Sequence, residues 1–165
     1  MSASSARAEE LARQFEQLND EVVAFVEACD DGAWRAQCAD DERSVGVVAQ
    51  HVADGHRAAS RWVRTIVAGQ PIAVTMDDIH AANAQAAAAS VNRSRGEVAG
   101  ALRQHGAAAA STLRGLSDED LARSAPFGPA GGSPVSAETI ITGIMLRHPR
   151  AHLDTMRKGA ASASQ

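Results

Sequence analysis

Residues 44–68 read SVGVVAQHVADGHRAASRWVRTIVA, and this stretch decides the fold. Ser44 is suited to be an N-cap, and Gly69 and Pro71 are stop signals, so we predict a helix that ends at about Ala68. Its apolar residues recur at helical spacing and form one stripe, made of Val45, Val48, Val52, Ala59, Trp62, Val63 and Ile66. A helix with one apolar stripe needs other helices to bury it.

Two more amphipathic stretches lie near the ends of the chain. Residues 5–29 carry apolar side chains at alternating steps of four and three, which places them on one side of a helix. Residues 136–158 show a similar pattern and predict the last helix. The segment before it, residues 125–134, is rich in glycine and proline and is expected to be a loop, and we find no β-strand pattern.

Residues 77–115 are too long for one regular helix. Asp77 or Asp78 is expected to cap the start of this stretch. Ser94 followed by Glu97 is a capping-box pattern, in which each residue satisfies a backbone N–H group of the other. We therefore predict a break or kink near residues 92–96.

Composition agrees with a helical protein. The chain has 165 residues, 45% of them hydrophobic, with many alanines and no tyrosine, so the usual strand residues are scarce. We predict an all-α fold, a four-helix bundle in one domain over residues 1–165, with a core over about residues 5–158 and a short flexible tail at 159–165. The net charge of −4 and the lack of a basic cluster argue against nucleic-acid binding. No apolar tract is long enough for a membrane span, and no signal peptide is evident, so we expect a cytoplasmic protein.

Two of the six histidines stand out on the last predicted helix. His148 and His152 are four residues apart and fall close to the centre of its apolar stripe. Neutral imidazoles at this spacing can bind one metal ion from one helix, although two buried histidines can also be satisfied by hydrogen bonds alone. Pro149 follows the first of the pair, and we expect it to kink the helix and to disfavour helical geometry at His148.

A metal site needs a third ligand, and helical spacing does not choose it. His51 and His56 lie on opposite edges of the stripe of residues 44–68. His105 lies within the stripe of the third stretch and is a rival, whereas His80 is expected at the surface. Spacing alone leaves these alternatives open.

The stretch SVGVVAQHVADGHR, residues 44–57, resembles the second-helix motif of the DinB-like superfamily. That superfamily includes the N-terminal domain of mycothiol-dependent maleylpyruvate isomerase and the mycothiol and bacillithiol S-transferases. Its members carry a His-x-x-x-His motif on the fourth helix, which HPRAH, residues 148–152, resembles. The resemblance implies a four-helix bundle with a divalent metal ion held by His51, His148 and His152.

Three neutral histidines leave a bound ion with its full charge and an open position. We expect zinc first, with nickel or iron as alternatives. The resemblance implies a low-molecular-weight thiol as a further ligand, and hence a metal-dependent thiol S-transferase or isomerase acting on a small molecule. Alternatives are a non-catalytic metal-binding or ligand-binding stress-response bundle, and a bundle whose histidines are only structural.

No catalytic residue can be assigned from the sequence. Asp54 points away from its helix stripe, so it is not expected to act as a base. Arg147 and Arg150 flank the histidine pair and either meet an anionic ligand or are solvated surface residues. A homodimer is plausible for an amphipathic bundle.

Overall fold

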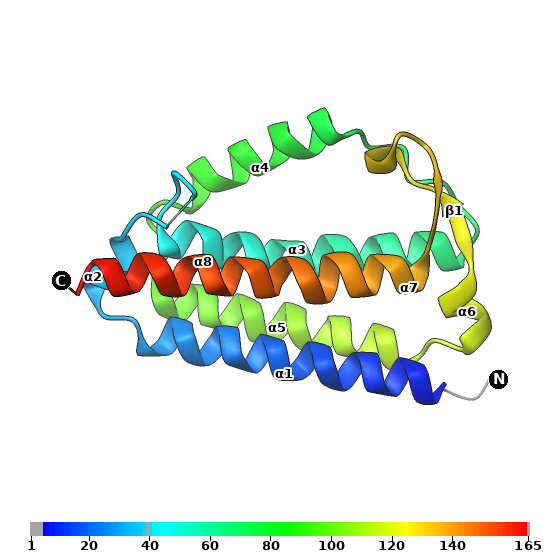
Figure 1. Cartoon of the computed structure of the whole chain (residues 1–165), viewed down its shortest axis with the longest axis horizontal. Coiled ribbons are helices and arrows are strands. Elements are labelled where there is room, and N and C mark those ends of the chain that lie inside the picture. The colour runs from blue at the N-terminus through cyan, green and yellow to red at the C-terminus, as the bar shows by residue number, and fades with distance from the viewer. Residues whose placement is uncertain (1–4, 39, 165) are drawn as a thin grey trace.

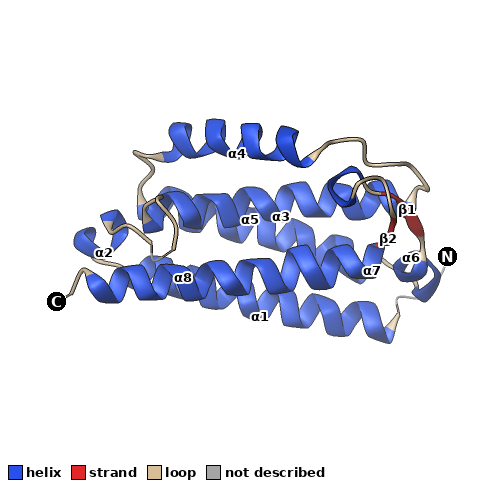
Figure 2. Ribbon diagram, turned by 45° about the horizontal axis from the view of Figure 1, so that its top comes forward, coloured by secondary structure: helices blue, strands red, loops and turns tan. Residues whose placement is uncertain are grey.

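The computed structural model describes residues 5–38 and 40–164, and its long helices lie side by side in a four-helix bundle (Figure 1). Figure 2 shows a small hairpin with a short helix beside it at one end of the bundle and another short helix at the opposite end. The all-α bundle is therefore confirmed. The helices are α1 (Ala6–Ala28), α2 (Asp31–Arg35), α3 (Val45–Val67), α4 (Met76–Ser90), α5 (Arg95–Arg114), α6 (Asp118–Ala122), η1 (Gly128–Ala130), α7 (Ala137–Ile140), η2 (Ile141–Arg147) and α8 (His148–Ser162).

The bundle consists of α1, α3, α5 and the continuous run from α7 through η2 to α8. The predicted cap at Ser44 forms as a hydrogen bond, in which its hydroxyl accepts from the Val47 N–H. At the start of the last helix, the Ser136 hydroxyl accepts from the Thr139 N–H in the same way. The apolar stripes are buried between the four helices, with α1 contributing residues such as Phe15. Burial of these side chains holds the bundle together, since a fully buried Leu or Phe contributes about 1.5–3 kcal/mol.

The third predicted stretch is divided between a bundle helix and an outer helix. The Ser94–Glu97 capping box forms at the start of α5, so the break was correctly predicted. The start of α4 was wrong by a few residues: Thr75 is the N-cap, and Asp78 is its partner in a second capping box. Helix α4 lies outside the bundle against α3, and Ser90 is its one buried residue (Figure 1).

The last helix changes its hydrogen-bonding pattern in the middle. Residues 141–147 (η2) form a π-helix, and Pro149 follows in the first turn of α8. Pro149 cannot donate a hydrogen bond to the preceding turn, and the wide π-helical turn before it accommodates that loss within the continuous helix. His148 is helical, with φ −65° and ψ −50°, so the expectation that Pro149 would drive it out of helical geometry is wrong.

The last helix is also longer than predicted. Helix α8 continues to Ser162 rather than ending near Lys158, so the start of the expected flexible tail is helical. Gly159, which was expected just beyond the helix end, is buried within it. A Cβ atom there would come within 2.8 Å of the Gln37 carbonyl oxygen and 2.9 Å of the Cys38 Cα. The glycine therefore serves close packing rather than helix termination.

The glycine- and proline-rich loop contains a short hairpin that the sequence did not reveal. Strands β1 (Ser124–Pro126) and β2 (Pro134–Ser136) pair antiparallel, and Ile72 forms an isolated bridge with Phe127 beside them. Pairs this short carry too few residues for a recognisable alternation. Among the described residues, no helix is both long and apolar enough to cross a membrane.

Candidate metal centre

Three histidines from two helices meet at one point of the bundle. His51 lies on α3, and His148 and His152 lie one turn apart on α8. One ring nitrogen from each lies within 4.8 Å of the others, and the Nε2 atoms of His148 and His152 are 2.5 Å apart. This distance is shorter than that of an ordinary N–H···N hydrogen bond, and the two Nε2 atoms face the same point.

The other histidines lie elsewhere and have different surroundings. His56 is buried, with its Nε2 atom 2.9 Å from the Asn19 side-chain oxygen. The Nδ1 atom of His105 lies 2.8 Å from the Ala53 carbonyl oxygen, where a protonated nitrogen donates to it. His80 is exposed on α4, as predicted. The structure thus separates His51 from its two rivals, which helical spacing could not do.

The three clustered histidines are held in their neutral form. Burial, followed by the charge of Arg43, lowers the pKa of His51 to about 4. Burial and the two neighbouring histidines lower the pKa of His152 to about 3. Burial and Arg43 also lower the pKa of His148. Neutral imidazoles keep a lone pair free, which is the state that binds a metal ion.

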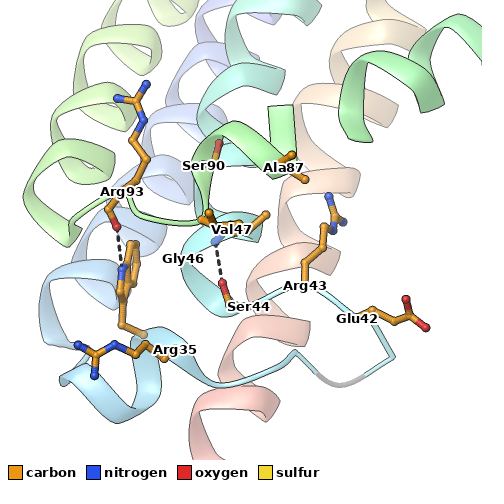
Figure 3. Close-up of a pocket in the computed structure, with 12 residues that line it drawn as sticks. Arg35, Glu42, Arg43, Ser44, Gly46, Val47, Ala87, Ser90 and Arg93 are labelled. Carbon is orange, nitrogen blue, oxygen red and sulfur yellow. Dashed lines mark hydrogen bonds between the residues drawn. The ribbon is translucent and has the colours of Figure 1, made fainter. Parts of the chain in front are cut away.

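Arg43 and Asp41 form a charged pair beside the centre that the sequence reasoning missed. The Arg43 guanidinium donates to both Asp41 carboxylate oxygens, at 2.6 Å for the shortest bond. Figure 3 shows Arg43 extending from the segment that leads into α3, on the opposite side of a neighbouring pocket from Arg35 and Arg93. Arg43 directly precedes Ser44, the N-cap of the helix that carries His51.

An apolar cavity of about 360 Å³ opens beside the histidines. Trp62 of α3 and Phe127 form part of its wall, with their rings 5.4 Å apart in an edge-to-face arrangement. Helix α4 contributes Met76 and Ile79. No Asp or Glu is among the described residues that line this cavity.

The donor set fits a divalent metal ion of the zinc, nickel or iron type. Imidazole nitrogens suit these ions, and three protein ligands leave a position open. Within residues 5–38 and 40–164, no other cluster of His, Cys, Asp or Glu side chains is close enough to share an ion. Arg150, considered above as an anion ligand, instead binds Glu21 with its two closest contacts at 2.6 and 2.9 Å, and Arg147 is exposed.

A four-helix bundle with a three-histidine centre beside an apolar cavity defines the class of this protein. Residues 14–156 match the family model of the DinB superfamily, and the chain belongs to that superfamily. No curated protein matches the chain.

The fold is similar to that of YfiT from Bacillus subtilis, described as a probable metal-dependent hydrolase with an unusual four-helix bundle topology. The TM-score is 0.79 at 17% sequence identity, and the match covers 99% of this chain and 91% of YfiT. At this identity the likeness establishes the shared fold.

Proposed function

We propose that this protein is a metal-dependent enzyme that transfers a low-molecular-weight thiol to an apolar electrophile. The observation that carries the proposal is the position of His51, His148 and His152, which converge beside an apolar cavity without a carboxylate. Such a cavity offers an electrophile a place to bind but offers no acidic side chain as a general base.

A divalent ion held by the three imidazoles would lower the pKa of a thiol beside it, so that the thiolate forms at neutral pH without a separate base. The chain supplies the remaining requirements. Desolvation and the neighbouring charges lower the pKa of all three imidazoles, which favours the neutral form that binds a metal ion. The Trp62 and Phe127 rings give the electrophile an apolar surface and exclude water from the reacting carbon.

Hydrolysis is the second candidate, because YfiT is described as a probable metal-dependent hydrolase. The same ion would also lower the pKa of a water molecule to about 7. The thiol reaction is favoured here because the superfamily that the motifs of residues 44–57 and 148–152 resemble includes thiol-dependent transferases and isomerases, and because the cavity carries no carboxylate that could act as a base on water. A non-catalytic metal-binding bundle is the outcome if neither reaction occurs.

The test uses protein reloaded with Zn²⁺, Ni²⁺ or Fe²⁺ and incubated with 1-chloro-2,4-dinitrobenzene and a panel of mycothiol, bacillithiol and glutathione. In the reaction a sulfur–carbon bond forms, the carbon–chlorine bond breaks, chloride leaves and the thiol proton goes to solvent. We expect thiol conjugation that is lost in His152→Ala and retained in His80→Ala, a histidine substitution on the exposed face of α4.

Conjugation no faster than with His152→Ala, for every thiol and metal, would refute the transferase proposal. Cleavage of p-nitrophenyl esters by the wild type without thiol would then support hydrolysis. Stoichiometric metal with neither reaction would support the non-catalytic bundle.

A further inference from the structure

A second cavity adjoins the histidine centre and is basic where the first is apolar. It has a volume of about 540 Å³ and is lined by residues of α3 and α4. His51, Gly55, Ala58 and Asn83 line both cavities. The two spaces therefore meet beside the metal centre, and we call the second one the basic groove.

Three arginines of α3 line the basic groove. Arg57, Arg61 and Arg64 follow one another at steps of four and three, so they project from one side of the helix within about 10 Å along its axis. Asp54 lines the groove with them and lies 4.0 Å from Arg57, while it accepts a hydrogen bond from Gln50 at 3.1 Å. The lining thus carries three positive charges against one negative charge.

These arginines differ from most others in the molecule in their lack of a close carboxylate. Arg150, for example, binds Glu21 with its two closest contacts at 2.6 and 2.9 Å. Arg57 has only the 4.0 Å contact, Arg64 donates to a threonine hydroxyl at 3.4 Å, and no ion pair of Arg61 occurs within the described residues. Guanidinium groups without a close carboxylate partner, in a concave surface, are suited to bind carboxylates through paired N–H···O bonds.

The junction of the two cavities is kept open by small residues. A Cβ atom built on Gly55 would meet nothing within 4 Å, and Ala58 lies one turn further along α3. Gly55 and Ala58 therefore add nothing larger than a methyl group where the two cavities meet, and Asp54 lies to one side of this junction.

We propose that the basic groove binds the carboxylates of the thiol substrate, so that its acidic part lies against Arg57, Arg61 and Arg64 and its sulfur lies beside the histidines. The electrophile then occupies the apolar cavity on the other side. The substrate class is a low-molecular-weight thiol that bears carboxylates. The thiol part of this inference rests on the proposed function, whereas carboxylate binding rests on the groove itself.

The first experiment compares two thiols that differ by one carboxylate, N-acetylcysteine and N-acetylcysteamine, by calorimetry on the zinc-loaded protein. The groove variant combines Arg57→Gln, Arg61→Gln and Arg64→Gln. The control variant, which loses the same charge elsewhere, combines Arg35→Gln, Arg93→Gln and Arg147→Gln. We expect the wild type and the control to bind the carboxylate thiol about tenfold more tightly, equivalent to about 1.4 kcal/mol, and the groove variant to lose this preference.

The second experiment tests carboxylate binding alone, without thiol or metal. Metal-free protein is titrated with tricarballylate, a tricarboxylate without sulfur. We expect binding by the wild type and the control variant, at least about tenfold weaker binding by the groove variant, and unchanged binding by His152→Ala. This pattern without conjugation activity would retain the groove and reject the proposed function.

Gly55→Leu gives a variant that keeps all charges. Leucine is a better helix former than glycine and would project into open space, so the fold is expected to be kept. We expect it to weaken N-acetylcysteine binding while helical circular dichroism is unchanged. Equal tricarballylate binding by the groove and control variants, or equal loss in both, would overturn the proposal.

Discussion

The same bundle holds two kinds of histidine, which differ in what their ring nitrogens contact. In the core, His56 faces the Asn19 amide at 2.9 Å and packs edge-to-face on Phe15, with ring centroids 4.8 Å apart. At the cavity, His148 and His152 face each other and His51 rather than a backbone or amide group. The cavity histidines are less enclosed than His56, since His51 and His152 are half-buried and His148, which was expected to face the core, is exposed. Burial lowers the pKa of both His56 and His51 to about 4.

The difference shows what distinguishes a structural histidine from a candidate ligand. A buried polar group normally has a hydrogen-bond partner within the protein, and His56 has one. The cavity histidines direct ring nitrogens at one another, an arrangement that a shared cation would stabilise. Substitution of one histidine of each kind should therefore separate the effect on stability from the effect on metal binding.

The largest expected effect is a double separation between His152→Ala and His56→Ala. His152→Ala should weaken zinc binding by more than about 100-fold. That is the upper end of the loss seen when a residue that only hydrogen-bonds to a metal ligand is replaced, and His152 would be a ligand itself. His56→Ala should keep stoichiometric zinc but lower the free energy of unfolding by about 3 kcal/mol, because it leaves a cavity and an unpaired Asn19 oxygen. Chelator competition and urea denaturation measure the two quantities.

The matched variant for stability is His51→Ala in metal-free protein. His51 is half-buried and has no hydrogen bond among the described residues, so its loss should change the free energy of unfolding by less than about 1 kcal/mol. If His51→Ala were as destabilising as His56→Ala, the distinction between the two kinds would be wrong.

Acid should destabilise the metal-free protein before the carboxylates titrate. The pKa of His56 is lowered from 6.5 to about 4, so below pH 6.5 the unfolded chain binds a proton that the folded chain refuses. Its contribution is fully present above pH 6.5 and is lost as the pH falls towards 4, by about 2 kcal/mol at pH 5. Urea denaturation between pH 7 and 5 should show a shallower loss in His56→Gln than in the wild type; an identical slope would contradict the assignment.

The smallest effect concerns the contact between Gly106 and Asn19, the residue that hydrogen-bonds to His56. Gly106 of α5 packs on Asn19, and a Cβ atom there would overlap the amide and lie 2.9 Å from its Cγ atom. Gly106→Ala should destabilise the protein by about 1–2 kcal/mol through overpacking. Gly100→Ala on the same helix meets nothing within 4 Å and should stabilise it by about 0.5–1 kcal/mol. Thermal unfolding of both variants would reveal equal shifts if the contact were unimportant.

Helical spacing predicted the bundle, because each bundle helix has one apolar stripe, and residue type predicted the caps at Ser44 and Ser94, because capping depends on local chemistry. It did not predict that α4 lies outside the bundle. That helix is rich in alanine and almost equally apolar on all sides, so periodicity gives no direction for its packing.

The candidate site was predictable only in part, for a related reason. His148 and His152 lie on one helix, so spacing could pair them, and family resemblance selected His51. Arg43 and Asp41 lie in an irregular segment, where no period relates a residue to its neighbours in space. The basic groove depends on where α4 passes over α3, which the sequence of neither helix states.

The π-helical segment η2 affects the direction in which the side chains after it project from the helix. An α-helix advances about 100° per residue, so a single residue more or less in residues 141–147 changes the angular phase of everything after it. The side chains of α7 are set by the core, whereas those of His148 and His152 are set by the cavity. The wide turn changes the rotation between α7 and α8, so that one continuous helix can direct the side chains of α7 into the core and those of His148 and His152 towards the cavity. An insertion or deletion in residues 141–147 should therefore disturb the histidine centre more than a substitution there, because it would rotate His148 and His152 away from His51.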